Sequence, residues 1–138
     1  MQQGPRIYNL FPSLVGPVSA WTGHLRRVRD MGFDWLFVNP FHEPGFSGSL
    51  YAVKDYFRLN PLFRGDDTRA DDAILAAFIA AAEKCGLSVM MDLVVNHTSK
   101  DSVVAADHPG WFVRDADGSL HSPGAVDPDD PEKITVWG

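Results

Sequence analysis

The sequence has 138 residues, and 45% of them are hydrophobic, which is enough to build one globular core. Its formal net charge is −6 and its 12 Lys and Arg residues are scattered, so we expect neither nucleic acid nor a membrane as a partner. A single cysteine, Cys85, excludes an internal disulfide, and no signal-peptide pattern or apolar run of membrane-spanning length occurs, which together predict a cytoplasmic protein.

The first forty residues predict two strands joined by a helix. Residues 7–11 are predicted as a strand, and the Pro and Gly residues of 12–17 indicate a turn after it. Ser19 is predicted to be the N-cap of the following helix, and Gly32 to lie just beyond the helix end. Residues 35–38 are predicted as the second strand. The helix is predicted from apolar residues at three- and four-residue spacing: Val18, Trp21, Leu25, Val28 and Met31.

A loop is predicted from residue 39 to residue 67, because no helical period appears there. Loops of this length are usually functional or disordered. Disorder is not expected here because the loop contains many aromatic residues, namely Phe41, Phe46, Tyr51, Tyr56, Phe57 and Phe63.

A second helix is predicted after this loop. Residues 68–71 (Thr-Arg-Ala-Asp) resemble a capping box at its start, and Lys84 with Gly86 indicates its end. The apolar face of this helix is predicted to consist of Ile74, Leu75, Phe78, Ile79 and Ala82.

The most informative stretch is residues 87–97, which read Leu-Ser-Val-Met-Met-Asp-Leu-Val-Val-Asn-His. Its nearly continuous apolar run predicts a third strand that is covered on both faces. Asp92 would be costly inside such a strand without a partner, and Asn96 and His97 follow at the strand's carboxyl end, where barrels of parallel strands carry their active sites. Two interpretations stay open: the wall of a functional site, or a buried Asp held by backbone amides beside an ordinary loop His.

The alternation of strands and helices predicts a parallel α/β sheet with right-handed crossovers. Residues 98–138 are rich in Asp, Pro and Gly and predict an irregular insertion with at most one helical turn near Ser102. Asp115-Ala-Asp117-Gly118 is interpreted as a polar turn, since the neighbouring residues lack calcium ligands at the required spacing. The aromatic residues expected to hold the insertion are Trp111, Phe112 and Trp137.

Asp92-Leu-Val-Val-Asn96-His97, together with the long loop after the second strand and the insertion after the third, resembles the α-amylase family, glycoside hydrolase family 13. That family's first conserved region reads Asp-x-x-x-Asn-His. Residues 50–56 resemble the family segment Gly-Tyr-Asp-x-x-Asp-Tyr, with Leu50 and Ala52 in place of its Gly and first Asp. The resemblance implies that residues 1–97 are the first three units of a TIM (β/α)8 barrel, and that residues 98–138 begin an inserted domain.

The resemblance also implies roles for four residues. Tyr51 would stack against the sugar on the non-reducing side of the cleaved bond, His97 would hydrogen-bond that sugar, and Asp92 would support the floor of the site. Asn96 would be a calcium ligand, so calcium is a possible cofactor of the full-length protein. The alternative for Tyr51 is a place in a small core beneath its loop.

The implied function is hydrolysis or transfer of α-glucosidic bonds in α-glucans or maltooligosaccharides by a retaining two-carboxylate mechanism. The nucleophile and acid would lie beyond Gly138, so we expect the 138-residue chain alone to be inactive. Two alternatives are an α-glucan maltosyltransferase that uses a sugar phosphate and a non-catalytic sugar-binding truncation. The sequence leaves the exact substrate and the oligomeric state open.

Overall fold

The computed structural model describes residues 4–122 and 124–136, which divide into two compact units. The described residues up to Phe41, together with Phe57–Leu93, form the first unit. His42–Tyr56 and the described residues from Val94 onward form the second unit. The predicted boundary between a barrel portion at 1–97 and an inserted domain at 98–138 stays a prediction.

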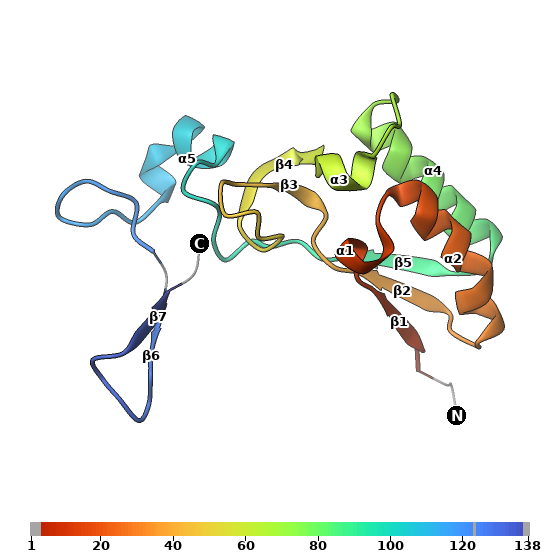
Figure 1. The fold of residues 1–138 in the computed structure, drawn as a ribbon, viewed down its shortest axis with the longest axis horizontal. Helices are drawn as coiled ribbons and strands as arrows, with labels where there is room; N and C mark the ends of the chain where they lie inside the picture. Colours follow the sequence, from red (N-terminus) through yellow and green to blue (C-terminus); the bar gives the residue numbers. More distant parts are fainter. Residues whose placement is uncertain (1–3, 123, 137–138) are drawn as a thin grey trace. The chain divides into compact units, whose positions relative to one another are not determined.

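The first unit contains a three-stranded parallel sheet with the order β1-β2-β5 (Figure 1). Its strands are β1 (Ile7–Leu10), β2 (Trp35–Val38) and β5 (Ser88–Met91). The register pairs Ile7 with Trp35 at one end and Val38 with Met91 at the other. The strands are connected through α2 (Val18–Asp30) and α4 (Asp71–Lys84), which lie on the same side of the sheet and pack against each other (Figure 1). The predicted mixed α/β class is therefore confirmed.

Trp21 on α2 is the centre of the first unit's core. Its side chain is fully buried, and its ring contacts Phe63 and Phe78 at centroid distances of 5.7 and 5.5 Å. The indole Nε1 donates a hydrogen bond to the Gly16 carbonyl at 2.7 Å, so burial leaves this polar group satisfied. The apolar face predicted for α2 is buried except for Met31, which is 47% exposed at the helix end.

The start of α2 differs from the prediction. The N-cap is Pro17 rather than Ser19, and its carbonyl accepts hydrogen bonds from the Ala20 and Trp21 amides at 2.8 and 3.3 Å. Residues predicted as a turn form the short helix α1 (Pro12–Val15). At the other end of α2, Gly32 follows the C-cap with φ of 91°, as predicted for a residue in the left-handed region.

The stretch predicted as a loop between residues 39 and 67 contains regular structure. Strands β3 (His42–Pro44) and β4 (Val53–Leu59) pair in a two-stranded sheet, and α3 (Pro61–Arg64) follows with its Asn60 side chain capping the Leu62 amide. These elements are short and lack a helical period, so the sequence pattern did not reveal them. Of the aromatic residues in this stretch, Phe63 is buried, whereas Phe57 in β4 is 88% exposed.

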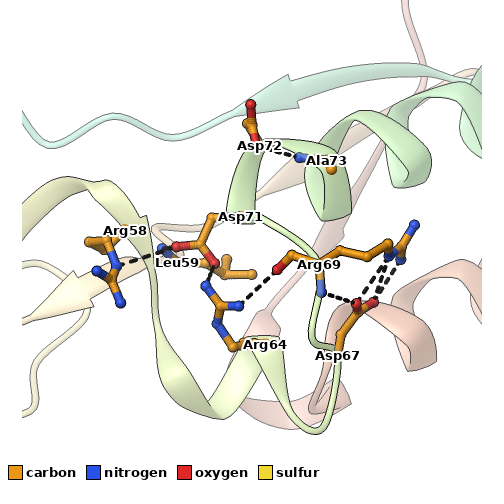
Figure 2. A network of polar contacts seen from close by, with 8 residues as sticks. All are labelled: Arg58, Leu59, Arg64, Asp67, Arg69, Asp71, Asp72 and Ala73. Atoms are coloured by element: carbon orange, nitrogen blue, oxygen red, sulfur yellow. Dashed lines mark hydrogen bonds and ion pairs between the residues drawn. The ribbon is translucent and has the colours of Figure 1, made fainter.

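Helix α4 begins without the predicted capping box. Its N-cap is Ala70, which has no capping side chain. The Asp71 carboxylate accepts a hydrogen bond from the Leu59 amide at 3.1 Å and pairs with Arg64 and, at 3.5 Å, with Arg58 (Figure 2). Asp71 therefore links the first turn of α4 to β4 and α3, instead of closing a local box with Thr68.

Beside this link, Asp67 pairs with Arg69 through hydrogen bonds of 2.6 to 3.2 Å (Figure 2). The Arg69 side chain and amide lower the pKa of Asp67 to about 2. The contribution of this pair to stability is present above the ordinary carboxyl pKa and is lost as the pH falls through about 2.

Strand β5 is shorter than the run of apolar residues suggested. It ends at Met91, so Asp92 lies directly after the strand rather than inside it. The Asp92 amide makes the last ladder bond, to the Val38 carbonyl at 2.9 Å, and Pro40 has no N–H with which to continue the ladder. The apolar residues that follow β5 are not covered on both faces as predicted, because the side chains of Leu93 and Val95 are 55% and 80% exposed.

In the second unit, α5 (Val103–Asp107) begins at Ser102, whose Oγ accepts from the Ala105 amide at 3.1 Å, as the predicted turn near Ser102 indicated. Asp115–Gly118 is a tight turn closed by a Gly118 to Asp115 backbone bond of 2.9 Å, also as predicted. The stretch is less irregular than expected, since η1 (Pro109–Trp111) follows α5 and β6 (Gly124–Val126) pairs antiparallel with β7 (Ile134–Val136).

Trp111 does not act as a core residue: its side chain is 73% exposed and stacks on His108 with ring centroids 4.0 Å apart. Trp137 lies outside the described residues. Within residues 4–122 and 124–136, no helix has both the length and the apolar character needed to cross a membrane.

We expect Asp71→Ala to lower the free energy of unfolding by about 1 to 3 kcal/mol, because it leaves the Leu59 amide and Arg64 without a half-buried acceptor. Asp72→Ala is the matched control. Asp72 occupies the same first turn, but it is exposed, and in Figure 2 its carboxylate accepts a hydrogen bond from the adjacent Ala73 amide. Its loss should cost about 0.5 kcal/mol or less. Urea unfolding of both variants measures the difference, and equal losses would contradict the role given to Asp71.

Candidate functional site

Residues 94–101 form the segment that carries the predicted Asn96 and His97, and a tyrosine holds it from β4. The Tyr56 hydroxyl donates to the Val94 carbonyl at 2.6 Å and lies 3.4 Å from the His97 carbonyl. Partial burial raises the pKa of Tyr56, so the hydroxyl stays protonated and remains a donor at neutral pH. Further along, the Ser99 amide donates to the Val53 carbonyl at 2.9 Å. The segment is therefore attached to β4 at several points.

A pocket of about 450 Å³ opens beside this segment within the second unit. One wall is Tyr56 with residues 95–100, and the other is built by residues around Trp111 and His121. Its lining combines aromatic surfaces with imidazole, amide and hydroxyl groups. Such a mixture suits a ligand that has both apolar faces and hydroxyls.

His97 is a half-buried member of this lining. Its Nδ1 lies 3.3 Å from the Asn96 Nδ2, so the two side chains of the Asn-His pair are in contact. If the Asn96 amide donates to Nδ1, the His97 proton is on Nε2, which can donate to a ligand hydroxyl. The structure thus brings these two predicted residues together.

Tyr51 lies in the connection between β3 and β4, in the same unit, and is 43% exposed. Its amide donates to the Ser49 Oγ at 3.3 Å. Tyr51 is not among the described residues that line the pocket. Asp92 belongs to the first unit, directly after β5, and is half-buried.

Calcium would need several oxygen ligands. In the part of the chain that the structure describes, no group of three or more His, Cys, Asp or Glu residues is placed to hold a metal ion. Asn96 is exposed and contacts His97. Calcium binding, with Asn96 as one ligand, stays a prediction for the full-length protein.

Three contributors to this region are not predicted from the sequence. Tyr56 was counted only as a loop aromatic, although it ends the Asp-Tyr part of the family-like segment, which is a signal that could have identified it. Trp111 is expected from the sequence to hold the insertion, but its exposed ring lines the pocket. Asp101 was not singled out, and its contacts with residues near Gly45 could not be read from the sequence spacing.

The fold and the site define an α/β protein with a parallel sheet and helical crossovers, whose Asp-x-x-x-Asn-His motif ends in an Asn-His pair that lines a pocket. Residues 3–114 match the family described as glycogen debranching enzyme, glucanotransferase domain. The chain belongs to the α-amylase family, glycoside hydrolase family 13.

Relatives with known names agree with this membership. A probable alpha-glucosidase of Rhizobium meliloti is 30% identical over 119 residues, covering 80% of this chain and 19% of the relative. An alpha-1,4-glucan:maltose-1-phosphate maltosyltransferase of Burkholderia pseudomallei is 36% identical over 135 residues, covering 82% of this chain and 12% of the relative. The chain thus spans less than a fifth of either protein.

Among solved structures, an alpha-amylase from Lactobacillus plantarum aligns with a TM-score of 0.74 and 36% identity, over 85% of this chain and 28% of that one. A maltogenic alpha-amylase from Thermotoga neapolitana aligns with a TM-score of 0.73 and 28% identity, over 83% and 29%. Both similarities extend over most of the described chain.

We expect Tyr56→Phe to lower stability by about 1 to 2 kcal/mol, because the Val94 carbonyl loses its hydroxyl donor. Tyr8→Phe removes a hydroxyl from the first unit and is the matched control, with an expected change within about 0.5 kcal/mol. Urea unfolding compares the two variants, and hydrogen exchange of residues 94–100 should rise only in Tyr56→Phe. Unchanged exchange there would show that the hydroxyl does not hold the segment.

Proposed function

We propose that the full-length protein containing these residues cleaves or transfers α-glucosidic bonds in α-glucans or maltooligosaccharides. The observation that carries this proposal is the family match over residues 3–114, which includes the motif ending in Asn96 and His97. The names of the relatives support the substrate class, since they include glucosidases and a glucan transferase. A cytoplasmic location is part of the proposal and rests on the single cysteine.

The proposed architecture is a (β/α)8 barrel to which the described sheet contributes its first three strands. Support comes from the parallel order β1-β2-β5 and from the crossovers through α2 and α4. In such barrels the substrate binds at the carboxyl ends of the strands. Asp92 follows the end of β5 directly, which is the position expected of a residue that supports the floor of a site.

In the proposed site, Tyr51 offers an aromatic face to the C–H surface of a pyranose, and His97 hydrogen-bonds one of its hydroxyls. Bond cleavage would follow the retaining route, in which one carboxylate attacks the anomeric carbon and a carboxylic acid protonates the leaving oxygen. The proposal assigns these two carboxylates to positions after Gly138. It follows that the 138-residue chain alone has no turnover.

The second candidate is transfer of maltosyl groups from a sugar phosphate. It is favoured by the 36% identity with the maltosyltransferase from Burkholderia pseudomallei. The third candidate is a sugar-binding protein without turnover. It differs from the two enzymatic candidates because it forms no product.

The deciding experiment incubates the purified full-length protein with maltooligosaccharides, with and without maltose 1-phosphate. We expect new glucan chain lengths or reducing sugar from the full-length protein and none from residues 1–138 alone. Phosphate release that requires maltose 1-phosphate would select the transferase. Binding of maltooligosaccharides without any product would contradict an enzymatic function.

Changing either sugar-contacting residue should act on the chemical step. We expect Tyr51→Ala and His97→Ala to lower kcat more than they raise KM, each costing about 2 to 4 kcal/mol of transition-state stabilisation, since the contacted ring distorts during the reaction. The matched control is Phe63→Ala, which removes a buried aromatic ring that packs on Trp21. It should lower stability by about 2 to 4 kcal/mol and leave kcat of the folded enzyme nearly unchanged.

Steady-state kinetics and thermal melts on the same three variants make this comparison. Normal turnover in Tyr51→Ala and His97→Ala, with only a lower melting temperature, would return both residues to a structural role.

A further inference from the structure

Gly45 and Ser99 are in unusually close contact in the second unit. Both residues are buried, and a Cβ atom built on Gly45 would collide with the side chains of Ser99 and Asp101. The φ angle of Gly45 is not in the left-handed region, so backbone conformation does not explain a glycine at this position. The glycine is explained by lack of space, because the side chains of Ser99 and Asp101 occupy the position that a Gly45 side chain would take.

The Asp101 carboxylate lies at this contact and joins three partners. Its Oδ1 accepts from the Ser99 Oγ at 2.5 Å and from the Phe46 amide at 3.4 Å. Its Oδ2 pairs with the Lys54 ammonium at 3.4 Å. We call Gly45, Phe46, Lys54, Ser99 and Asp101 the Asp101 cluster.

The Asp101 cluster connects two segments that each carry a predicted sugar-contacting residue. One is the loop 45–52, which closes on itself through the Gly45 amide to the Ala52 carbonyl at 2.9 Å and contains Tyr51. The other is the segment 94–101, which contains His97 and is attached to β4 through the Ser99 amide. In the described structure, Asp101 is a side chain of the second segment that holds the backbone of the first.

We propose that Asp101 is a positioning residue, which holds the loop carrying Tyr51 against the segment carrying His97. The consequence for activity rests on the proposed function, in which both residues contact the sugar. A stacked ring must keep its place relative to the hydrogen-bonding imidazole for both contacts to form at once, and small displacements of such groups are costly. The Ser99 hydroxyl, foremost among its partners, lowers the pKa of Asp101, so the carboxylate is ionised throughout the neutral range.

The first test measures positioning directly and does not depend on activity. Hydrogen exchange of the peptide spanning residues 45–52 is compared in the full-length protein and in Asp101→Ala. We expect exchange to be about tenfold faster in the variant, because Phe46 loses its acceptor and the loop loses its anchor. Asp107→Ala, which removes an exposed carboxylate from α5 in the same unit, is the matched control and should leave exchange unchanged.

The second test is a double-mutant cycle on kcat/KM with Tyr51. If Asp101 acts through the Tyr51 loop, Asp101→Ala should lower kcat/KM about tenfold with Tyr51 present and less than about twofold in the Tyr51→Ala background. A purely structural role would lower both backgrounds by the same factor. Asp101→Asn keeps an acceptor for Ser99 and Phe46, so it should retain most of the activity that Asp101→Ala loses.

The outcomes separate the two proposals. Unchanged exchange at 45–52 in Asp101→Ala overturns the positioning role. If exchange is faster but Asp101→Ala lowers kcat/KM by the same factor with and without Tyr51, the role of Asp101 in catalysis through the Tyr51 loop is overturned. Wild-type kcat/KM in Tyr51→Ala contradicts the proposed site itself, and exchange then still decides whether Asp101 holds the loop.

Gly45→Ala, which inserts a methyl group into the cluster, should reproduce the exchange result of Asp101→Ala without changing any charge.

Discussion

The burial of one tryptophan determines how the first unit is assembled. The Trp21 ring contacts a phenylalanine from α3 and another from α4, and its indole N–H is satisfied by the carbonyl just after α1. Three segments besides its own helix surround this fully buried ring, and its single donor has an acceptor. The two crossover helices α2 and α4 are therefore held against each other through this ring.

The second unit is held together in a different way. Its described residues include few buried apolar side chains. Its recurring contacts are hydrogen bonds donated by the hydroxyls of Tyr56, Ser99 and Ser102, with the Asp101 carboxylate as an acceptor. Hydrogen bonds contribute modestly in net terms but fix direction, so a unit built from them can hold segments in register without a large core. This is the region in which the candidate sugar-contacting residues Tyr51 and His97 both lie.

Much of the first unit could be predicted from the sequence because its elements are long or strongly patterned. The strand 35–38 has the predicted bounds, and the buried positions of α2 follow the predicted spacing up to Val28. The predictions of element ends are wrong where a contact with a residue distant in sequence decides where an element begins or ends. Asp71 bonds to Leu59 rather than to its own helix start. Strand β5 stops where Pro40, two residues after the end of β2, has no N–H to continue the ladder. Neither partner is visible in a local window.

The candidate site was predictable to the extent that it depends on one continuous motif. Asn96 and His97 are adjacent in the sequence, and their contact follows from that adjacency. Tyr56 is 41 residues from His97, and Asp101 is 55 residues from Phe46 in the loop that carries Tyr51, so only the folded chain shows these contacts. The resemblance to the family predicts which residues would contact the sugar. The residues that hold those side chains in place are identified only from the contacts in the structure.

The departures of residues 50–56 from the family pattern have a local physical explanation. Ala52 stands where the family has an Asp, and it is 4% exposed, with its amide bonded to the Ser49 carbonyl and its carbonyl accepting from Gly45. A carboxylate at this buried position would need a new partner, because an unpaired buried charge is costly. The loop 45–52 instead contacts a carboxylate from another segment, because the Phe46 amide donates to the Asp101 Oδ1 at 3.4 Å. This chain thus keeps the tyrosine of the segment while the charge that anchors the loop comes from the residues that follow His97.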